Sequence, residues 1–181
     1  MARLPRVFID TSELFPFTIM DVLLTLSEDF LFTWVWTDEV LAEWEEVIVR
    51  EGRRTPESAA SVSAAVRQHF GRYRIDPALY RDKVTNDLST DPKDRVHAAA
   101  AIHGDVDIRL TVLTAGVKVI TSDEFLVDLL KRRRQGVVES FTRAATSKKR
   151  PPITGHELAD KIAAAGAPRF AERLHRLLGS T

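Results

Sequence analysis

The sequence predicts an α/β protein in which short apolar strands alternate with longer helices. Three observations support this fold class. The run Val7, Phe8 and Ile9 is apolar and partly β-branched, which is typical of a short buried strand. Asp10 follows this run directly, so its carboxylate is expected at the carboxyl edge of the sheet, where ligands of open α/β sheets bind. Finally, capping residues separate the other apolar runs from segments with helical periodicity.

The composition is that of an ordinary globular domain. The chain has 181 residues, of which 44% are hydrophobic and 29% charged, enough to bury a sizeable core. Its 26 basic and 26 acidic residues cancel, so any nucleic-acid binding depends on local clusters such as 131–134 and 148–150, which also fit solvated helix ends. The chain has no cysteine, which excludes disulfides and thiolate metal sites. No apolar run resembles a signal peptide or membrane span, so a cytoplasmic location is expected.

The remaining elements follow from the same patterns. A helix is predicted over 14–30, with Pro16 tolerated in its first turn. Thr37 caps the next helix, and Thr55 followed by Pro56 opens another. Further strands are predicted over 32–36, 107–113 and 117–120, and helices over 38–51, 55–70, 77–88, 92–102, 121–130 and 137–145.

The end of the chain is predicted to form a helical hairpin. Pro151 and Pro152 mark a boundary, and a capping box from Thr154 to Glu157 opens a helix behind it. Gly166 separates that helix from a last one. We therefore predict a main domain over residues 1–147 and a helical extension over residues 148–181.

Three acids stand where a carboxylate either stabilises a helix start or binds a ligand. Asp10 and Asp123 each follow an apolar strand, and Asp94 lies in the first turn of a helix opened by Asp91 and Pro92. Capping of the next helix is the ordinary explanation for each of them. A metal or phosphate site is the alternative, because a carboxylate at a sheet edge is costly to bury without a positive partner.

The residue pattern does not decide which of two further acids faces a site, and it favours a structural role for one histidine. Glu43 and Glu45 lie at opposite edges of the apolar stripe of the 38–51 helix, and periodicity does not choose between them. His97 is interpreted as a satisfied or exposed histidine and not as a ligand, because no second histidine stands at metal-binding spacing.

Taken in order, several motifs resemble those of the PIN-domain nucleases, and more narrowly the VapC-type toxins in which a DxxDR element opens the helix of the third acid. They cover most of the chain, and they are Asp10-Thr11-Ser12, Thr37-Asp-Glu-Val-Leu-Ala-Glu43, Asp91-Pro-Lys-Asp94-Arg95, Asp123-Glu-Phe-Leu-Val-Asp-Leu-Leu130 and Arg150-Pro-Pro-Ile-Thr154. The resemblance implies a PIN-like parallel sheet sandwiched by helices, with carboxylates gathered around Mg²⁺ or Mn²⁺ at one edge.

Carried over residue by residue, the resemblance makes Asp10, Glu43 and Asp94 the metal-binding and catalytic acids. The implied reaction is hydrolysis of an RNA phosphodiester by a metal-dependent endoribonuclease, which would be the toxin of a type II toxin–antitoxin pair. The implied partners are an RNA substrate and a cognate antitoxin, and a homodimer is a further expectation.

Supporting roles are also implied by the resemblance. Thr11 or Ser12 would hydrogen-bond a metal-bound water or an acid, and Arg95 would pair with the carboxylates or with a phosphate.

One segment departs from the family pattern. The branch has a fourth polar ligand after the strand that follows the third acid, whereas this chain has Val112 or Leu113 there. Asp123 or Asp107 would then substitute, or three acids suffice, or activity is weak or lost. The alternative function is therefore a degenerate PIN-fold binding module without nuclease activity. Enzymes that form an aspartyl phosphate fit less well, because haloacid dehalogenases need an acid where this chain has Ser12.

Overall fold

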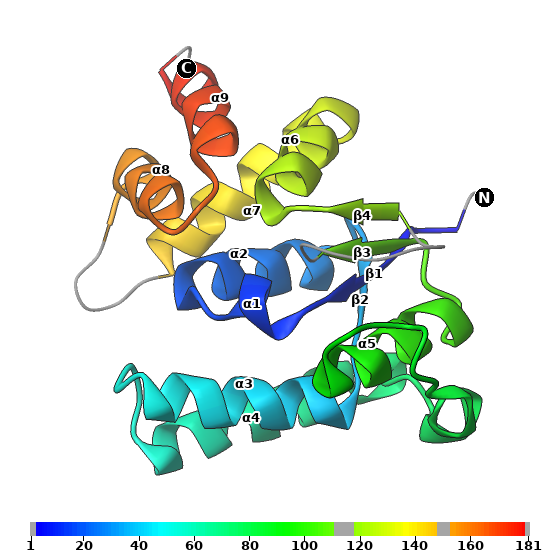
Figure 1. Cartoon of the computed structure of the whole chain (residues 1–181). Helices are drawn as coiled ribbons and strands as arrows, with labels where there is room; N and C mark the ends of the chain where they lie inside the picture. Colours follow the sequence, from blue (N-terminus) through cyan, green and yellow to red (C-terminus); the bar gives the residue numbers. More distant parts are fainter. Residues whose placement is uncertain (1–2, 111–117, 148–152, 180–181) are drawn as a thin grey trace. The chain divides into compact units, whose positions relative to one another are not determined.

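The computed structural model describes residues 3–110, 118–147 and 153–179 (Figure 1). The chain forms two compact units. We call Pro5–Phe15 with Thr33–Val119 the sheet unit, and Met1–Leu4 with Pro16–Phe32 and Ile120–Thr181 the helical unit. The departure from the family pattern at Val112 or Leu113 lies outside the described residues.

Parallel strands form the centre of the sheet unit. The strand order is β2-β1-β3-β4, where β1 is Arg6–Ile9, β2 Thr33–Val35, β3 Ile108–Leu110 and β4 Lys118–Ile120. Strand β1 pairs in parallel with β2 on one side, where Phe8 lies opposite Val35, and with β3 on the other, where Ile9 lies opposite Leu110. Because the chain leaves β1 for neighbours on both sides, the carboxyl end of β1 is a topological switch point, at which α/β proteins bind ligands.

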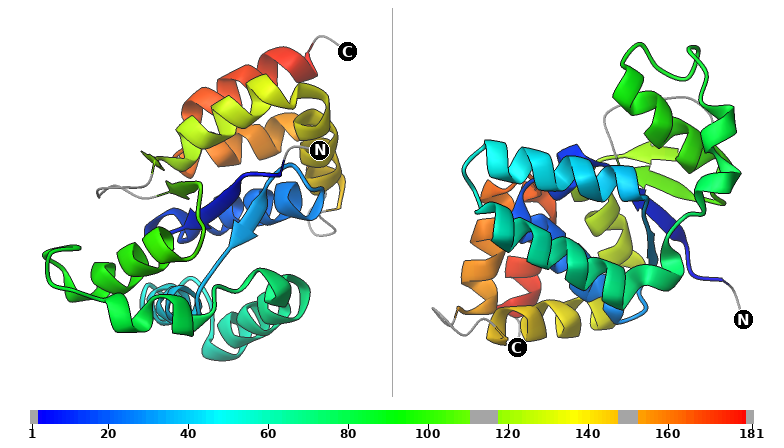
Figure 2. Two further views of the ribbon diagram at one scale, coloured as in Figure 1. Left: turned by 90° about the vertical axis from the view of Figure 1, so that its right-hand side faces the viewer. Right: turned by 90° about the horizontal axis from the view of Figure 1, so that it is seen from below.

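Two buried tryptophans connect distant segments of the sheet unit. The indole of Trp44 donates a hydrogen bond to the carbonyl of Leu14 at 3.2 Å, and the indole of Trp36 donates to that of Phe70 at 2.9 Å. These bonds satisfy two buried donors and join segments that are 30 and 34 positions apart in the sequence. The helices are α1 (Thr11–Leu14), α3 (Asp38–Arg50), α4 (Pro56–Phe70) and α5 (Pro92–His103), and α3 runs beside α4 (Figure 2).

The helical unit consists of helices only, apart from the end of β4, over the residues that the structure describes. Two edge-to-face aromatic pairs lie in its core: Phe32 with Phe125 at 5.0 Å and Phe141 with Phe170 at 6.0 Å between ring centroids. Helices α8 and α9 pack side by side as a hairpin, drawn in orange and red in Figure 2. Its helices are α2 (Phe17–Glu28), α6 (Ser122–Arg132), α7 (Arg134–Thr146), α8 (Gly155–Ala164) and α9 (Pro168–Leu178).

The predicted α/β class, the parallel strands and the C-terminal helical hairpin are confirmed. The helix predicted over 14–30 is confirmed as α2 over Phe17–Glu28, but it begins later than predicted, because α1 ends at Leu14 and Pro16 takes an extended conformation ahead of α2. Proline lacks an amide hydrogen and its ring clashes with the preceding turn, so the helix cannot continue through it. The predicted boundary between residues 147 and 148 stays a prediction.

The helix predicted over 77–88 is also wrong. The structure has two 3₁₀ turns there, η2 (Pro77–Leu79) and η3 (Arg81–Lys83), and a third, η1 (Gly71–Tyr73), follows α4. Tyr80 between η2 and η3 is fully buried, and its hydroxyl donates a hydrogen bond to Glu39 at 2.6 Å. This tertiary contact outweighs the local helical pattern.

In the described part of the chain, no helix combines the length and the apolar character that crossing a membrane requires.

Replacing Thr37 by valine is expected to destabilise the fold by about 1 kcal/mol. The side chain of Thr37 is fully buried and its hydroxyl accepts a hydrogen bond from the amide of Val40 at 3.3 Å, which caps α3. Valine keeps the shape and removes the acceptor. The matched control is Thr25→Val in α2, where the hydroxyl only bonds back to the carbonyl of Asp21. Urea unfolding of both variants tests this, and an equal loss in both would contradict the capping role.

Candidate metal centre

Asp10 stands at the carboxyl end of β1, where the switch point predicts a ligand site. Its amide donates a hydrogen bond to the carbonyl of Leu110 at 3.0 Å, which extends the β1 and β3 pairing by one residue. The residue is only 7% exposed, and its Oδ2 accepts a hydrogen bond from Nη2 of Arg109 at 3.3 Å. A buried carboxylate is thus held by a buried guanidinium, as such burial requires.

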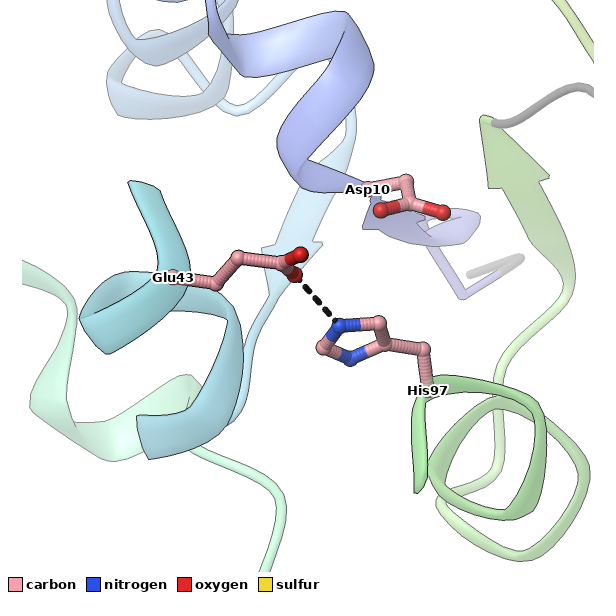
Figure 3. Close-up of side chains that lie close together, drawn as sticks. All are labelled: Asp10, Glu43 and His97. Carbon is pink, nitrogen blue, oxygen red and sulfur yellow. Dashed lines mark hydrogen bonds and ion pairs between the residues drawn. The ribbon is translucent and has the colours of Figure 1, made fainter. Parts of the chain in front are cut away.

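Glu43 reaches the same place from α3 (Figure 3). Its Oε2 accepts a hydrogen bond from the hydroxyl of Thr11 at 2.9 Å and contacts Nε2 of His97 at 2.8 Å. The hydrogen bond from His97 holds the pKa of Glu43 below its ordinary value, with help from Thr11 and against the opposing effect of burial. Glu43 is therefore an anion at neutral pH, as a metal ligand must be.

His97 lies on α5 and is only 3% exposed. An ionised carboxylate only accepts hydrogen bonds, so the Nε2 that faces Glu43 carries the hydrogen. Nδ1 is buried and has no hydrogen-bond partner among the described residues. The interpretation of His97 as a histidine whose hydrogen bonds are satisfied therefore holds for Nε2 and not for Nδ1.

Asp94 lies in the first turn of α5, three residues before His97 and on the same side of the helix. The side chain of Asp91 caps this helix by accepting a hydrogen bond from the amide of Lys93 at 2.9 Å, and Pro92 follows as its first residue. Burial raises the pKa of Asp94 above its ordinary value, and the negative charges of Asp10 and Asp91 raise it further. Asp94 and Asp10 thus repel each other.

The cluster fits a divalent cation. Asp10, Glu43 and His97 each place one ligand atom so that the three atoms lie within 4.8 Å of one another (Figure 3). Carboxylate oxygens are the ligands that Mg²⁺ and Mn²⁺ prefer, and a cation among them would relieve the repulsion that Asp94 experiences. The unpartnered Nδ1 of His97 indicates a polar site whose buried groups are not all satisfied by the protein itself.

A pocket of about 310 Å³ opens beside the cluster, between α3 and α5. Glu43 and His97 belong to its wall, so both are accessible from it. The wall is otherwise mixed in charge, and its residues are Glu39, Ala42, Glu43, Glu46, Lys93, Val96 and His97.

Arg95 contacts the segment before α5, while its predicted contact with a phosphate stays a prediction. Its Nε donates to the carbonyl of Ser89 at 2.7 Å, Nη1 to the side chain of Asn86 at 2.7 Å and Nη2 to the carbonyl of Thr90 at 3.2 Å. The guanidinium thus holds the loop that precedes α5, and among the described contacts it has none with the carboxylates. Its influence on the site passes through the position of α5.

The other predicted residues have contacts or surroundings of their own. Asp123 belongs to α6 in the helical unit, where its Oδ1 accepts a hydrogen bond from the amide of Phe170 at 2.8 Å. Asp107 accepts a hydrogen bond from the amide of Arg6 at 2.7 Å. Ser12 is exposed on α1. For Asp123 and Asp107 these backbone hydrogen bonds are sufficient structural reasons for a carboxylate.

Sequence reasoning missed Arg109. This residue is 3% exposed in the middle of β3, opposite Phe8 of β1. The available signal was an arginine inside the apolar run from Ile108 to Leu113, because a buried arginine requires an acidic partner. Asp10 is that partner.

Comparison with known proteins finds one family. Residues 122–176 match the family model of the VapC50 C-terminal domain. This segment runs from α6 into α9 within the helical unit. The match supports a VapC-type toxin of a toxin–antitoxin system, and with it a nuclease. No curated protein and no solved structure gives a significant match to the chain.

Proposed function

We propose that this chain is a metal-dependent endoribonuclease and the toxin of a type II toxin–antitoxin pair. The observation that carries the proposal is the convergence of ligand atoms from Asp10, Glu43 and His97 within 4.8 Å. The family match of residues 122–176 supports it independently, because that segment contributes none of these side chains.

Asp10 and Glu43 of this cluster would hold Mg²⁺ or Mn²⁺ in this proposal, together with Asp94, which is the third acid that the resemblance implies and whose charge interacts with that of Asp10. The chemistry that a bound cation would supply there is a lowered pKa of a water and positive charge beside the RNA phosphate. Arg109 holds the carboxylate of Asp10, while Thr11 and His97 orient that of Glu43. A fourth ligand at Asp123 stays a prediction.

The partner in this proposal is a cognate antitoxin. The VapC match supports such a partner, and the pocket beside Glu43 and His97 is a place where an antitoxin segment would block the acids. A homodimer and a cytoplasmic location stay predictions.

A calorimetric titration with Mn²⁺ tests the metal site. The wild-type chain is expected to bind Mn²⁺, and Asp10→Asn is expected to lose that binding, because an amide replaces a charged ligand. Asp105→Asn is the matched control, since Asp105 is an exposed acid of the sheet unit that pairs with Arg6 at 3.6 Å. Absence of binding by the wild type would favour the degenerate binding module.

RNA cleavage by the same proteins tests the reaction. Asp10→Asn is expected to lower the cleavage rate by at least about 100-fold, more than the loss of an outer-shell partner of a metal site causes. Asp105→Asn should cleave at the wild-type rate. Cleavage that Asp10→Asn retains, or that EDTA leaves unchanged, would refute the proposed mechanism.

A further inference from the structure

We propose that the helical unit binds the phosphodiester backbone of single-stranded RNA in a basic pocket between three of its helices. The choice of RNA rests on the proposed function, whereas the pocket itself does not. It has a volume of about 250 Å³ and is lined by Leu130 and Lys131 of α6, Arg134 of α7, and Arg173, Arg176 and Leu177 of α9. We call it the basic pocket.

The cations of the basic pocket are poorly neutralised by the protein. Arg176 pairs with Glu172 on the surface of α9. Lys131, Arg134 and Arg173 have no ion pair or side-chain hydrogen bond within the described ranges 3–110, 118–147 and 153–179. The chain as a whole carries no net charge, so this excess of positive charge is local.

The preference of cations for the C-terminal ends of helices does not explain all the cations of the basic pocket. Lys131 lies in the last turn of α6, where the helix dipole favours a cation. Arg134, in contrast, is the first residue of α7, where the dipole is positive and disfavours a cation, and Arg133 provides no side-chain cap there. An anion bound among these cations would relieve both the dipole and the mutual repulsion of the side chains.

The chemistry of the lining favours a phosphodiester. Guanidinium groups bind phosphate oxygens through paired hydrogen bonds, and a lysine adds a point charge. Leu130 and Leu177 provide apolar surface against which a ribose or base can pack. The volume is at the small end of ligand pockets, which suits one phosphate with its sugar. All four cations of the basic pocket lie within the segment 122–176 that matches the family model, and they are Lys131, Arg134, Arg173 and Arg176.

The test measures RNA affinity without catalysis or metal. In an Asp10→Asn background with EDTA, fluorescence anisotropy follows binding of a labelled single-stranded RNA of about 12 nucleotides. Salt is varied from about 50 to about 200 mM, the range in which phosphate contacts change affinity strongly. The variants are Lys131→Gln and Lys131→Gln/Arg173→Gln. Lys161→Gln is the matched control, because Lys161 is an exposed lysine of α8 in the same unit but outside the basic pocket.

Each pocket cation removed is expected to reduce the slope of log affinity against log salt by about 0.7. The double variant should therefore lose about 1.4 in slope, equivalent to roughly 25-fold weaker binding at about 0.1 M salt if the affinity at 1 M is unchanged. Lys161→Gln should leave the slope unchanged. Glutamine keeps much of the aliphatic stem, so the double variant should melt no lower than its parent.

Four results would overturn the proposal. Equal losses in Lys131→Gln and Lys161→Gln would mean that only bulk charge matters. Unchanged RNA affinity in the double variant, or absence of RNA binding by the parent, would assign the basic pocket to another partner, such as an acidic antitoxin segment. A lower melting temperature would indicate a structural role. Because no metal is present in this test, none of these results bears on Mn²⁺ binding at Asp10.

Discussion

Replacing Asp94 by asparagine is expected to stabilise the metal-free protein while it removes Mn²⁺ binding and at least about 100-fold of RNA cleavage. Burial and the charges of Asp10 and Asp91 raise the pKa of Asp94 in the folded chain. A carboxyl with a raised folded pKa lowers the free energy of unfolding when it ionises. Asparagine removes that charge, so the melting temperature in EDTA should rise at neutral pH.

The stabilisation expected for Asp94→Asn depends on pH. As the pH falls through the raised pKa of Asp94, the wild-type side chain takes up a proton and loses its unfavourable charge. The difference in melting temperature between the wild type and Asp94→Asn should therefore shrink in acid. Thermal melts at about pH 7 and about pH 4, near the ordinary carboxyl pKa, measure it.

Mn²⁺ should reverse the order of the two melting temperatures, so that the wild type melts above Asp94→Asn. A ligand that binds only the folded state raises the melting temperature, so Mn²⁺ should stabilise the wild type and leave Asp94→Asn unchanged. Asp105→Asn, at an exposed acid outside the cluster, is expected to behave like the wild type throughout. A lower melting temperature of Asp94→Asn in EDTA would show that the carboxylate makes a favourable contact in the metal-free fold.

Replacing Arg109 by methionine is expected to destabilise the metal-free fold by about 3–5 kcal/mol. The side chains of Arg109 and Asp10 are 3% and 10% exposed, so loss of the guanidinium removes a positive charge from beside a buried carboxylate. Chemical denaturation in EDTA measures this loss. Mn²⁺ should restore part of the stability, because the cation supplies positive charge to the same carboxylate.

A double variant separates charge from packing. Asp10→Asn/Arg109→Met removes both charges, so it should be more stable than Arg109→Met alone. The matched control is Arg74→Met, which breaks an exposed pair with Asp38 and should cost about 1 kcal/mol or less. If the double variant is as unstable as the sum of its two single changes, Arg109 acts through packing and not through the charge of Asp10.

The acids at the ends of local elements could be predicted from the sequence. Asp10 follows a run of apolar residues and Asp94 follows an Asp91-Pro92 helix start, and both patterns lie within a few residues. The geometry of a strand end or a first helical turn is set by such short-range features. Their positions are accordingly as expected.

Contacts between distant segments could not be predicted in the same way. Periodicity left Glu43 and Glu45 equivalent, whereas the structure brings Glu43 against Thr11 and His97, which are 32 and 54 positions away. The pairing of Arg109 with Asp10 spans 99 positions. No local propensity reports which distant polar side chains will be buried together, because these contacts depend on how the strands and helices pack in the folded chain.

Because β1 lies between β2 and β3 in the sheet, the site around Asp10 cannot form until β3 has been synthesised. Arg109, which lies on the neighbouring strand β3 and pairs with Asp10, is made 99 residues after Asp10. At about 5–20 residues per second, a ribosome needs roughly 5–20 s to cover that distance. A nascent chain therefore exposes its first acid for seconds before the acids can act together, and the site becomes complete only after the helix that bears Asp94 and the strand that bears Arg109 have left the ribosome.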